Sequence, residues 1–421
     1  MSRLFVNARL LDPANGLDAP GTLLVEAGRI AALNPAAPPA DAERIDCAGA
    51  CLCPGLVDMR VGLREPGEEH KESLATLAAC AAAGGVTTLA ALPDTDPPLD
   101  EPALVEFVTR RAASLGVTVI PYGAATKRCE GRELAELGLL REAGAAAFTD
   151  GRRAIAEART MRLALSYAAT FGAFIIQHPE EPSLASGGAV TEGFQATMLG
   201  LPGIPAAAEA IMVARDIRLA ALTGGHVHFA HVSTAEALAL IRDAKAKGIR
   251  ITCDTAPPYF DLNETAVGEW RTYARLSPPL RAEADRLAVL AALADGTIDA
   301  IASDHQPQDT DAKRLPFAQA EPGGVGLETL LAVTLNAVHA GHLPLLDALA
   351  LLTHRPARLL GVEAGRLAEG APADLCLFDL DRAWQIRADD LCGNSRNTPF
   401  DGRPVQGKVL GTWKAGRRVF G

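Results

Sequence analysis

The sequence predicts an α/β protein in which a (β/α)8 barrel is combined with a small β-sandwich built from both ends of the chain. Between about residues 54 and 355, apolar runs alternate with Ala-, Leu-, Glu- and Arg-rich stretches of helical pattern. About eight such units in series indicate a closed barrel of parallel strands. Residues 1–53 and 356–421 instead contain short runs of alternating apolar and polar residues between turns, which is typical of antiparallel strands.

The two ends of the chain are predicted to join into one sandwich. Each end contains too few strands to bury a core by itself, so we expect the two sets of strands to pack together. The predicted strands are LFVNARLLD (4–12), GTLLVEAGRIAALN (21–34), ERIDCAGACLCPG (43–55), ADLCLFDL (373–380), RAWQI (382–386) and GKVLGTWKAGRRVFG (407–421).

The central segment supplies the predicted barrel strands, most of which end in a polar residue. The apolar runs are VTTLAAL (86–92), VTVIPYG (117–123), AAAFTD (145–150), AFIIQHP (173–179), HVHFAHVS (226–233), IRITCDT (249–255) and DAIASDH (299–305). The polar residues at their ends are Asp94, Asp150, His178, His231, Asp254 and Asp304. The carboxyl ends of barrel strands form one rim, so we expect any chemistry there.

Four of these strand-end residues have the chemistry of a metal site. His178 and His231 with a carboxylate such as Asp150 are typical zinc ligands, and Asp304 can act as a base. The alternative is that each residue only forms hydrogen bonds at the end of its strand.

A second histidine pair has a different predicted role. His226 and His228 lie at the beginning of their strand, and alternation along the strand points their side chains away from His231. We therefore expect them to pack against the helices outside the barrel.

Composition excludes several function classes. The chain has 40 Lys+Arg against 51 Asp+Glu, a formal net charge of −11, and no long basic cluster, which argues against a nucleic-acid partner. No apolar stretch approaches the roughly 20 residues that cross a bilayer, and no signal-peptide core develops at the amino terminus. We expect a cytoplasmic protein without membrane contact, whose eight scattered cysteines are reduced.

Several longer motifs resemble the dihydroorotases of the amidohydrolase superfamily. They include PGLVDMRVGLREPGEEHKE, AAAGGVTTLAALPDT, HVHFAHVSTAEAL, LSPPLR, IDAIASDHQP and GRLAEGAPADLCLFDL, in order over nearly the whole chain. The resemblance implies a barrel of the metal-dependent hydrolase type, a zinc cofactor, and reversible cyclisation of N-carbamoyl-L-aspartate to L-dihydroorotate in pyrimidine biosynthesis.

The main metal-binding motif of that family is altered here. The family's first barrel strand ends in His-x-His, and the matching positions are Arg60 and Gly62. A guanidinium has no lone pair to donate and glycine has no side chain, so neither can bind zinc. We expect no cofactor, or zinc only if His178, His231 and Asp150 still hold it. We also expect Arg60 to replace the metal as a counter-ion for Asp150 and Asp304.

The resemblance also assigns substrate-binding positions. Arg64 matches the arginine that binds the substrate carboxylate in the family. Asp94 and Ser277 stand where the family has Asn, and Gln308 stands where it has His. Asp94 would repel an anionic substrate, so substrate binding is expected to be weakened.

These observations lead to three functional hypotheses. The first is a dihydroorotase-like protein without catalytic activity that acts as a structural partner of aspartate carbamoyltransferase, as a homodimer or in a larger complex. The second is an active dihydroorotase with a reduced zinc site, in which Asp304 is the general base and Arg64 binds the substrate carboxylate. The third is a small-molecule sensor that keeps the pocket for binding alone.

Overall fold

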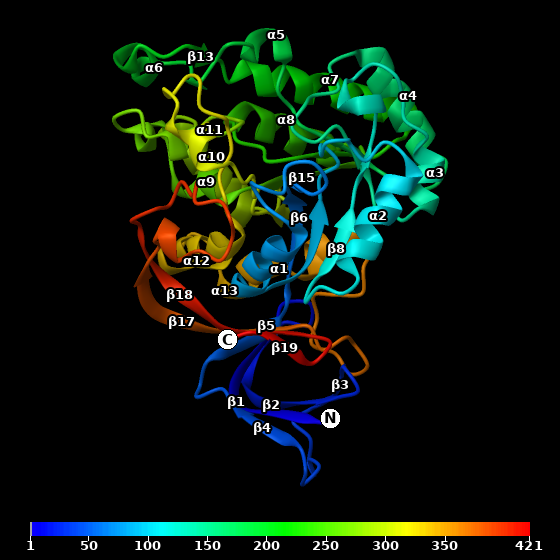
Figure 1. Ribbon diagram of the computed structural model, residues 1–421, viewed down its shortest axis with the longest axis vertical. Helices are drawn as coiled ribbons and strands as arrows, with labels where there is room; N and C mark the ends of the chain where they lie inside the picture. The colour runs from blue at the N-terminus through cyan, green and yellow to red at the C-terminus, as the bar shows by residue number, and fades with distance from the viewer. Residues whose placement is uncertain (1) are drawn as a thin grey trace.

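The computed structural model describes residues 2–421 and contains a closed barrel of parallel strands (Figure 1). Hydrogen-bonded pairs run from β6 through β7 to β8 and from β9 through β10, β11, β14 and β15 to β16. A parallel bridge between Val61 and His305 closes the circle, with the Gly62 amide donating to the His305 carbonyl at 2.7 Å. The strands are β6 (Leu56–Val61), β7 (Val86–Ala91), β8 (Thr118–Pro121), β9 (Gly123–Ala124), β10 (Phe148–Thr149), β11 (Ile175–Gln177), β14 (Val227–Phe229), β15 (Ile251–Thr255) and β16 (Ala300–Ile301).

Helices surround the barrel and begin and end at recognisable signals. Ser73 caps α1 through a reciprocal pair of hydrogen bonds with Thr76, and Gly224 ends α7 in the left-handed conformation that glycine adopts without strain. The main helices are α1 (Leu74–Ala83), α2 (Pro102–Ala112), α3 (Leu137–Glu142), α4 (Ala158–Ala169), α7 (Ala207–Thr223), α8 (Ala235–Ala246), α10 (Glu283–Ala294), α12 (Leu330–His339), α13 (Leu345–Leu352) and α14 (His354–Leu360). Short helices and a small ribbon lie in the loops above the rim: α5 (Pro182–Ala185), α6 (Phe194–Leu199), α9 (Pro257–Asp261), α11 (Thr310–Arg314), β12 (Val190–Thr191) and β13 (Gly203–Ile204).

Alternation along the strands separates two apolar layers. Residues such as Phe148 and Phe229 face the helices, whereas Met59, Tyr122 and Phe174 fill the barrel interior. Tyr122 satisfies its buried hydroxyl by donating to the Met59 carbonyl at 2.8 Å. Both layers are therefore packed core, and the open space lies above the rim.

The expected position of His226 and His228 is wrong. His228 is fully buried, with Nδ1 2.9 Å from Thr252 Oγ1 and Nε2 2.9 Å from Asp254 Oδ2. The imidazole rings of His226 and His228 both lie against Phe174 of the barrel interior. The alternation argument fails because His231 has a φ of +40°, so the extended backbone ends before it. His228 and His231 consequently both turn inward.

The strands of both termini form one eight-stranded sheet below the barrel (Figure 1), and the predicted fold class is confirmed. Antiparallel pairing of β5 with β17 joins the two ends of the chain, and the sheet curls so that Phe5 of β1 and Trp413 of β18 meet with ring centroids 5.0 Å apart. The strands are β1 (Arg3–Asp12), β2 (Leu17–Glu26), β3 (Arg29–Leu33), β4 (Glu43–Asp46), β5 (Cys51–Pro54), β17 (Leu375–Gln385), β18 (Pro404–Lys414) and β19 (Arg417–Phe420).

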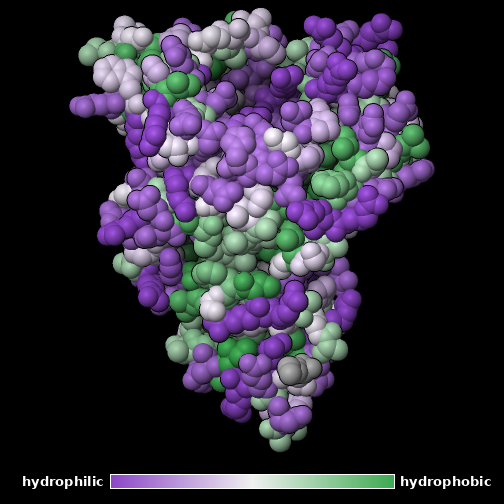
Figure 2. Space-filling view, viewed as in Figure 1, coloured by the Kyte–Doolittle hydropathy of each residue, from purple (hydrophilic) through white to green (hydrophobic). Residues whose placement is uncertain are grey.

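The surface in the same view is mostly hydrophilic over the barrel. Figure 2 shows apolar side chains gathered lower down, at the level where α1 meets the terminal sheet. Among residues 2–421, none of the helices combines the length and the apolar character needed to cross a membrane.

Candidate functional site

Four of the strand-end residues are linked side by side at the rim of the barrel. Arg60 Nε donates to Asp304 Oδ1 at 2.9 Å, and Asp304 Oδ2 lies 3.0 Å from His231 Nδ1. His231 Nε2 lies 2.7 Å from His178 Nδ1, and His178 Nε2 lies 3.6 Å from Glu180 Oε2. The result is a continuous row of polar contacts from the end of β6 to the loop after β11.

Burial and charge set the protonation of this row. Burial by itself would raise the pKa of Asp304, but His231 and Arg60 outweigh it and hold the pKa well below its usual value. Burial, with the nearby Arg60 cation, lowers the pKa of His231 to about 4. Neutral His231 therefore donates from Nδ1 to the Asp304 carboxylate and accepts at Nε2 from the Nδ1–H of His178.

The backbone at this rim is strained at two of the same residues. His231 has a φ of +40° and Asp304 a φ of +49°, in the left-handed region that non-glycine residues rarely adopt. Residues held in this way cost about 1–3 kcal/mol each and cluster at functional sites. The strain turns both side chains toward each other where the strands end.

Asp150 does not join the row. Both its oxygens point to the neighbouring loop, where they accept hydrogen bonds from the Thr126 amide (2.9 Å), the Thr126 hydroxyl (2.5 Å) and the Gly131 amide (3.1 Å). Burial raises the pKa of Asp150 to about 6, although these hydrogen bonds oppose the shift. Arg60 does not contact the Asp150 carboxylate; its Nη2 donates to the carbonyl of the next residue, Gly151, at 3.1 Å. The expected pairing of Arg60 with Asp150 is therefore wrong, whereas its pairing with Asp304 is present.

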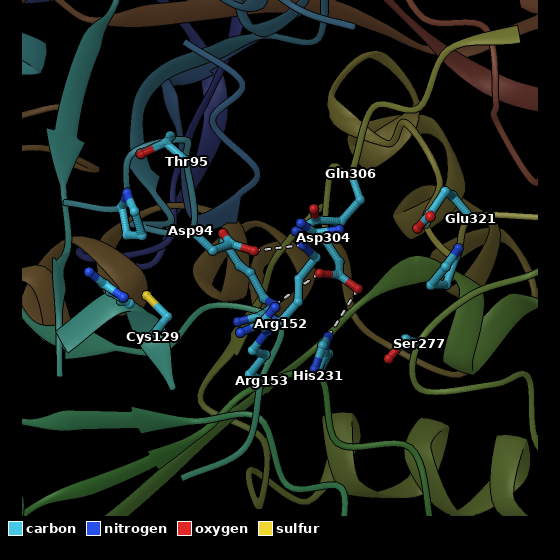
Figure 3. Close-up of a pocket in the computed structure, with 15 residues that line it drawn as sticks. Asp94, Thr95, Cys129, Arg152, Arg153, His231, Ser277, Asp304, Gln306 and Glu321 are labelled. Carbon is cyan, nitrogen blue, oxygen red and sulfur yellow. Dashed lines mark hydrogen bonds and ion pairs between the residues drawn. The ribbon is translucent and has the colours of Figure 1, made fainter. Parts of the chain in front are cut away.

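Above the row lies a cavity of about 410 Å³ (Figure 3). This volume lies within the range of small-molecule pockets, about 300–1,000 Å³. The charged and polar residues that line it are Arg60, Asp94, Thr95, Arg128, Arg152, Arg153, His231, Ser277, Asp304, Gln306 and Glu321.

The four predicted substrate-binding residues fall into two groups. Asp94 and Ser277 line the cavity. Arg64 and Gln308 are buried outside its wall, where Arg64 Nε donates to the Pro307 carbonyl at 3.1 Å and Gln308 Nε2 donates to the Pro322 carbonyl at 3.0 Å. Gln306 follows β16, as Gln308 does, but its side chain lines the cavity. Its Oε1 accepts a hydrogen bond from Arg64 Nη2 at 3.2 Å.

The carboxylate of Asp94, from which we expect repulsion of an anionic substrate, is paired with a cation. Arg152 Nε donates to Asp94 Oδ2 at 2.6 Å, and Figure 3 shows the two side chains facing each other. Burial would raise the pKa of Asp94, but Arg152 and Arg64 keep the pKa below its usual value, so this carboxylate is ionised and neutralised in place.

Sequence reasoning missed three arginines of the cavity, Arg128, Arg152 and Arg153. A signal was available for two of them, because Gly-Arg-Arg directly follows the strand-end residue Asp150. No comparable signal marks Arg128, which reaches the cavity only through the shape of its loop.

The donor atoms of the rim, as arranged, do not fit a zinc ion. Both oxygens of Asp304 and both ring nitrogens of His231 are used within the row, and both oxygens of Asp150 are used by its loop. Among Asp150, His178, His231 and Asp304, the one side-chain donor atom outside hydrogen-bond distance of a partner is Nε2 of His178, whereas zinc takes three or four protein ligands. Across residues 2–421, no group of three or more His, Cys, Asp or Glu side chains has a geometry that could hold a metal.

Position 62 is also closed to a ligand. A Cβ atom at Gly62 would lie 2.6 Å from Gln306 Oε1 and 2.9 Å from the His305 carbonyl oxygen. A larger side chain here requires the loop after β16 to move, since the second contact is with backbone.

Comparisons with known proteins agree on one family. Profiles described as "Dihydro-orotase-like" and "Amidohydrolase family" match residues 49–237 and 197–420. Proteins named Dihydroorotase from Pelobacter propionicus and Geotalea daltonii are each 44% identical to this chain, covering all of it and 100% and 99% of their own lengths. The L-hydantoinase (dihydropyrimidinase) of Arthrobacter aurescens superposes over 100% of this chain and 96% of its own, with a TM-score of 0.90 at 26% identity. The dihydropyrimidinase of Brevibacillus agri, at 23% identity and a TM-score of 0.86, covers 100% and 95% and shares the fold. The chain belongs to the dihydroorotase family of amidohydrolases.

Proposed function

We propose that this chain is a dihydroorotase homologue of pyrimidine biosynthesis that does not carry out zinc-dependent turnover and acts as a structural partner of aspartate carbamoyltransferase. In this proposal the chain uses no cofactor, and it assembles as a homodimer or in a larger complex with that enzyme. The choice of partner rests on the sequence resemblance, and the loss of turnover rests on the geometry of the rim.

The observation that carries the proposal is the contact of Arg60 with Asp304. A permanent cation sits 2.9 Å from the carboxylate, and its side chain is 1% exposed. A second cation brought to the same carboxylate would be repelled, since like charges about 4 Å apart cost about 4 kcal/mol at an effective dielectric constant of 20. Arg60 thus supplies the positive charge that the rim needs and excludes a divalent ion.

A second candidate function is active dihydroorotase, and the names of the relatives favour it. Full-length proteins 42–44% identical to this chain are named Dihydroorotase. In this case Asp304 would be the general base, and His178 and His231 would rearrange to hold zinc. The hydrogen bonds that now connect these residues would have to break first.

One set of experiments separates the two candidates. Protein purified without chelators is analysed for metal content, and the loss of L-dihydroorotate is followed with and without added zinc. His178→Ala and His231→Ala are assayed in parallel. Zinc near one equivalent with turnover that both substitutions abolish establishes active dihydroorotase and rejects our proposal. No metal and no turnover at any zinc concentration agrees with it.

The partner is tested separately. The tagged chain is co-expressed with aspartate carbamoyltransferase from the same cell, and the mass of the purified species is measured by light scattering. A stoichiometric complex that survives His178→Ala supports a structural role independent of the rim. Two separate species of unchanged mass reject this partner, whatever the outcome of the zinc assay.

A further inference from the structure

Two neighbouring helices on the outside of the barrel present a surface without exposed carboxylates. Helices α4 and α7 pack against each other in the layer that surrounds the strands (Figure 1). The sequence of α4 contains no Asp or Glu, and the two acidic residues of α7, Glu209 and Asp216, are buried. The chain as a whole has a formal net charge of −11, so this surface differs in sign from the protein that carries it.

Three exposed arginines give this surface its positive charge. Arg159 and Arg162 lie on α4, and Arg218 lies on α7. None of the three forms an ion pair with any residue between 2 and 421, and Arg218 donates only to a carbonyl of its own helix. Glu157, just before α4, already accepts from the Thr160 hydroxyl at 3.0 Å. The three guanidinium groups are therefore available to carboxylates from outside the chain.

Four large apolar side chains share the surface with the arginines. Leu163 and Tyr167 of α4 and Ile211 and Leu222 of α7 are all exposed, Leu222 by 68%. Along each helix they and the arginines recur at intervals of three, four or seven residues, which places them on one outward side. The Tyr167 ring stands edge-on to Phe171, with ring centroids 5.5 Å apart. Tyrosine and arginine beside exposed leucine and isoleucine are typical of the centre of a protein interface.

Buried polar contacts fix the arrangement of the two helices. Arg215 of α7 pairs with Asp216 at 2.7 Å, and its Nη2 donates to the Ile155 carbonyl, just before α4, at 2.7 Å. Asp216 also accepts from Gln177 Nε2 of β11 at 2.8 Å. Because these contacts anchor both helices to the barrel, a partner that docks on them does not have to order the backbone first.

A second copy of the chain does not fit this surface. A dimer about a twofold axis is isologous, so an axis centred here brings the arginines of one copy against the same arginines of the other. Like charges placed across an interface suppress the pairing, whereas carboxylates on a different chain neutralise the arginines. The flanking helices expose acidic residues, Glu142 on α3 and Glu236 and Asp243 on α8, which mark the edges of the positive surface.

We propose that the outward face of α4 and α7 docks an acidic protein surface with an apolar centre, presented by a chain other than this one. Carboxylates of the partner pair with the three arginines, because a guanidinium group binds a carboxylate through two parallel hydrogen bonds. Apolar side chains of the partner cover the exposed leucines. That this partner is aspartate carbamoyltransferase rests on the proposed function, whereas the location and chemistry of the surface rest on the two helices.

The test measures binding of the full-length chain to aspartate carbamoyltransferase from the same cell, by surface plasmon resonance at low and high salt. One variant combines Arg162→Glu with Arg218→Glu, and a second carries Leu222→Ser. The matched control combines Arg110→Glu with Phe107→Ser, which changes an exposed arginine and an exposed apolar residue of α2. Thermal melting shows that each variant is folded, and glutamine replaces glutamate at both arginines if the charge reversal lowers the melting temperature.

We expect the double charge reversal to weaken binding about 10- to 100-fold and Leu222→Ser about 5- to 10-fold, with the α2 control within about twofold. Binding of the unmodified chain should also weaken as salt screens the charges. A complex that forms equally well with every variant overturns the docking surface and leaves the proposed partner standing. No complex with the unmodified chain overturns both. The docking surface is also rejected if light scattering shows that the charge reversal converts a dimer of this chain into monomers, since a second copy then covers the two helices.

Discussion

Removing the buried cation of the rim should destabilise the protein more than removing an exposed one. Arg60 is 1% exposed and Asp304 11% exposed, with 2.9 Å between Nε and Oδ1. Arg60→Met keeps most of the length of the side chain but removes its charge, so the buried Asp304 keeps only His231 as a partner. Breaking a buried pair from one side costs about 3–5 kcal/mol, and we expect a loss of that size in the free energy of unfolding.

The exposed pair of Arg9 and Asp18 is a matched control. Arg9 Nε and Asp18 Oδ1 lie 2.7 Å apart, but the side chains are 40% and 34% exposed. Arg9→Met should therefore cost less than about 1 kcal/mol, because water screens the charges and solvates whichever is left. Both variants are measured by equilibrium urea unfolding, with the midpoint and slope fitted separately.

A double-mutant cycle isolates the charge effect at the rim. Asp304→Asn added to Arg60→Met removes the uncompensated charge, so the double variant should unfold less easily than Arg60→Met alone. We expect a coupling energy of about 2 kcal/mol or more. A loss below about 1 kcal/mol for Arg60→Met, or effects of the two substitutions that simply add, would refute the role of Arg60 as the internal counter-ion of Asp304.

Three further predictions concern other parts of the molecule. Burial raises the pKa of Asp58 to about 7 from 3.8, so the folded chain keeps this proton to a higher pH than the unfolded chain. The free energy of unfolding should therefore fall by up to about 4 kcal/mol as the pH rises from 4 to 7. Asp58→Asn should flatten that dependence in thermal melts at pH 5 and 8, and an unchanged slope would contradict the assignment. Gly62→Ala should lower the free energy of unfolding by about 1–3 kcal/mol in urea, because its Cβ meets the loop after β16. The control is Gly138→Ala in α3, where the Cβ meets the movable hydroxyl of Tyr167 at 3.0 Å. This control should be neutral or stabilising by up to about 1 kcal/mol. Trp413→Ala removes a ring that is 2% exposed and packs on Phe5, so it should lower the free energy of unfolding by about 3–5 kcal/mol. We also expect the terminal strands to become sensitive to limited proteolysis. Unchanged resistance of these strands to protease would show that the sheet does not depend on this contact.

Strand periodicity was enough to predict the architecture and three residues of the rim row. The apolar runs of the centre became the barrel strands, and the alternating runs at both ends became one sheet, because burial on two faces or on one face leaves different patterns in a sequence. His178, His231 and Asp304 met at the rim because parallel strands end on the same side of a barrel. The substitution at Arg60 was also visible, since it requires only the chemistry of the residue type.

Tertiary structure alone decided where the rim side chains point and which charges pair. Asp150 turned to the loop of Thr126, Arg152 neutralised Asp94, and Arg128 reached the cavity, each through the shape of a loop that follows a strand. The loops after the barrel strands contain left-handed residues such as Arg128, Cys129 and His231, at which the two-residue period of a strand ends. A pattern of apolar and polar residues reports which face of an element is buried, but contacts between loops distant in sequence depend on backbone angles and on charges brought together only when the barrel closes.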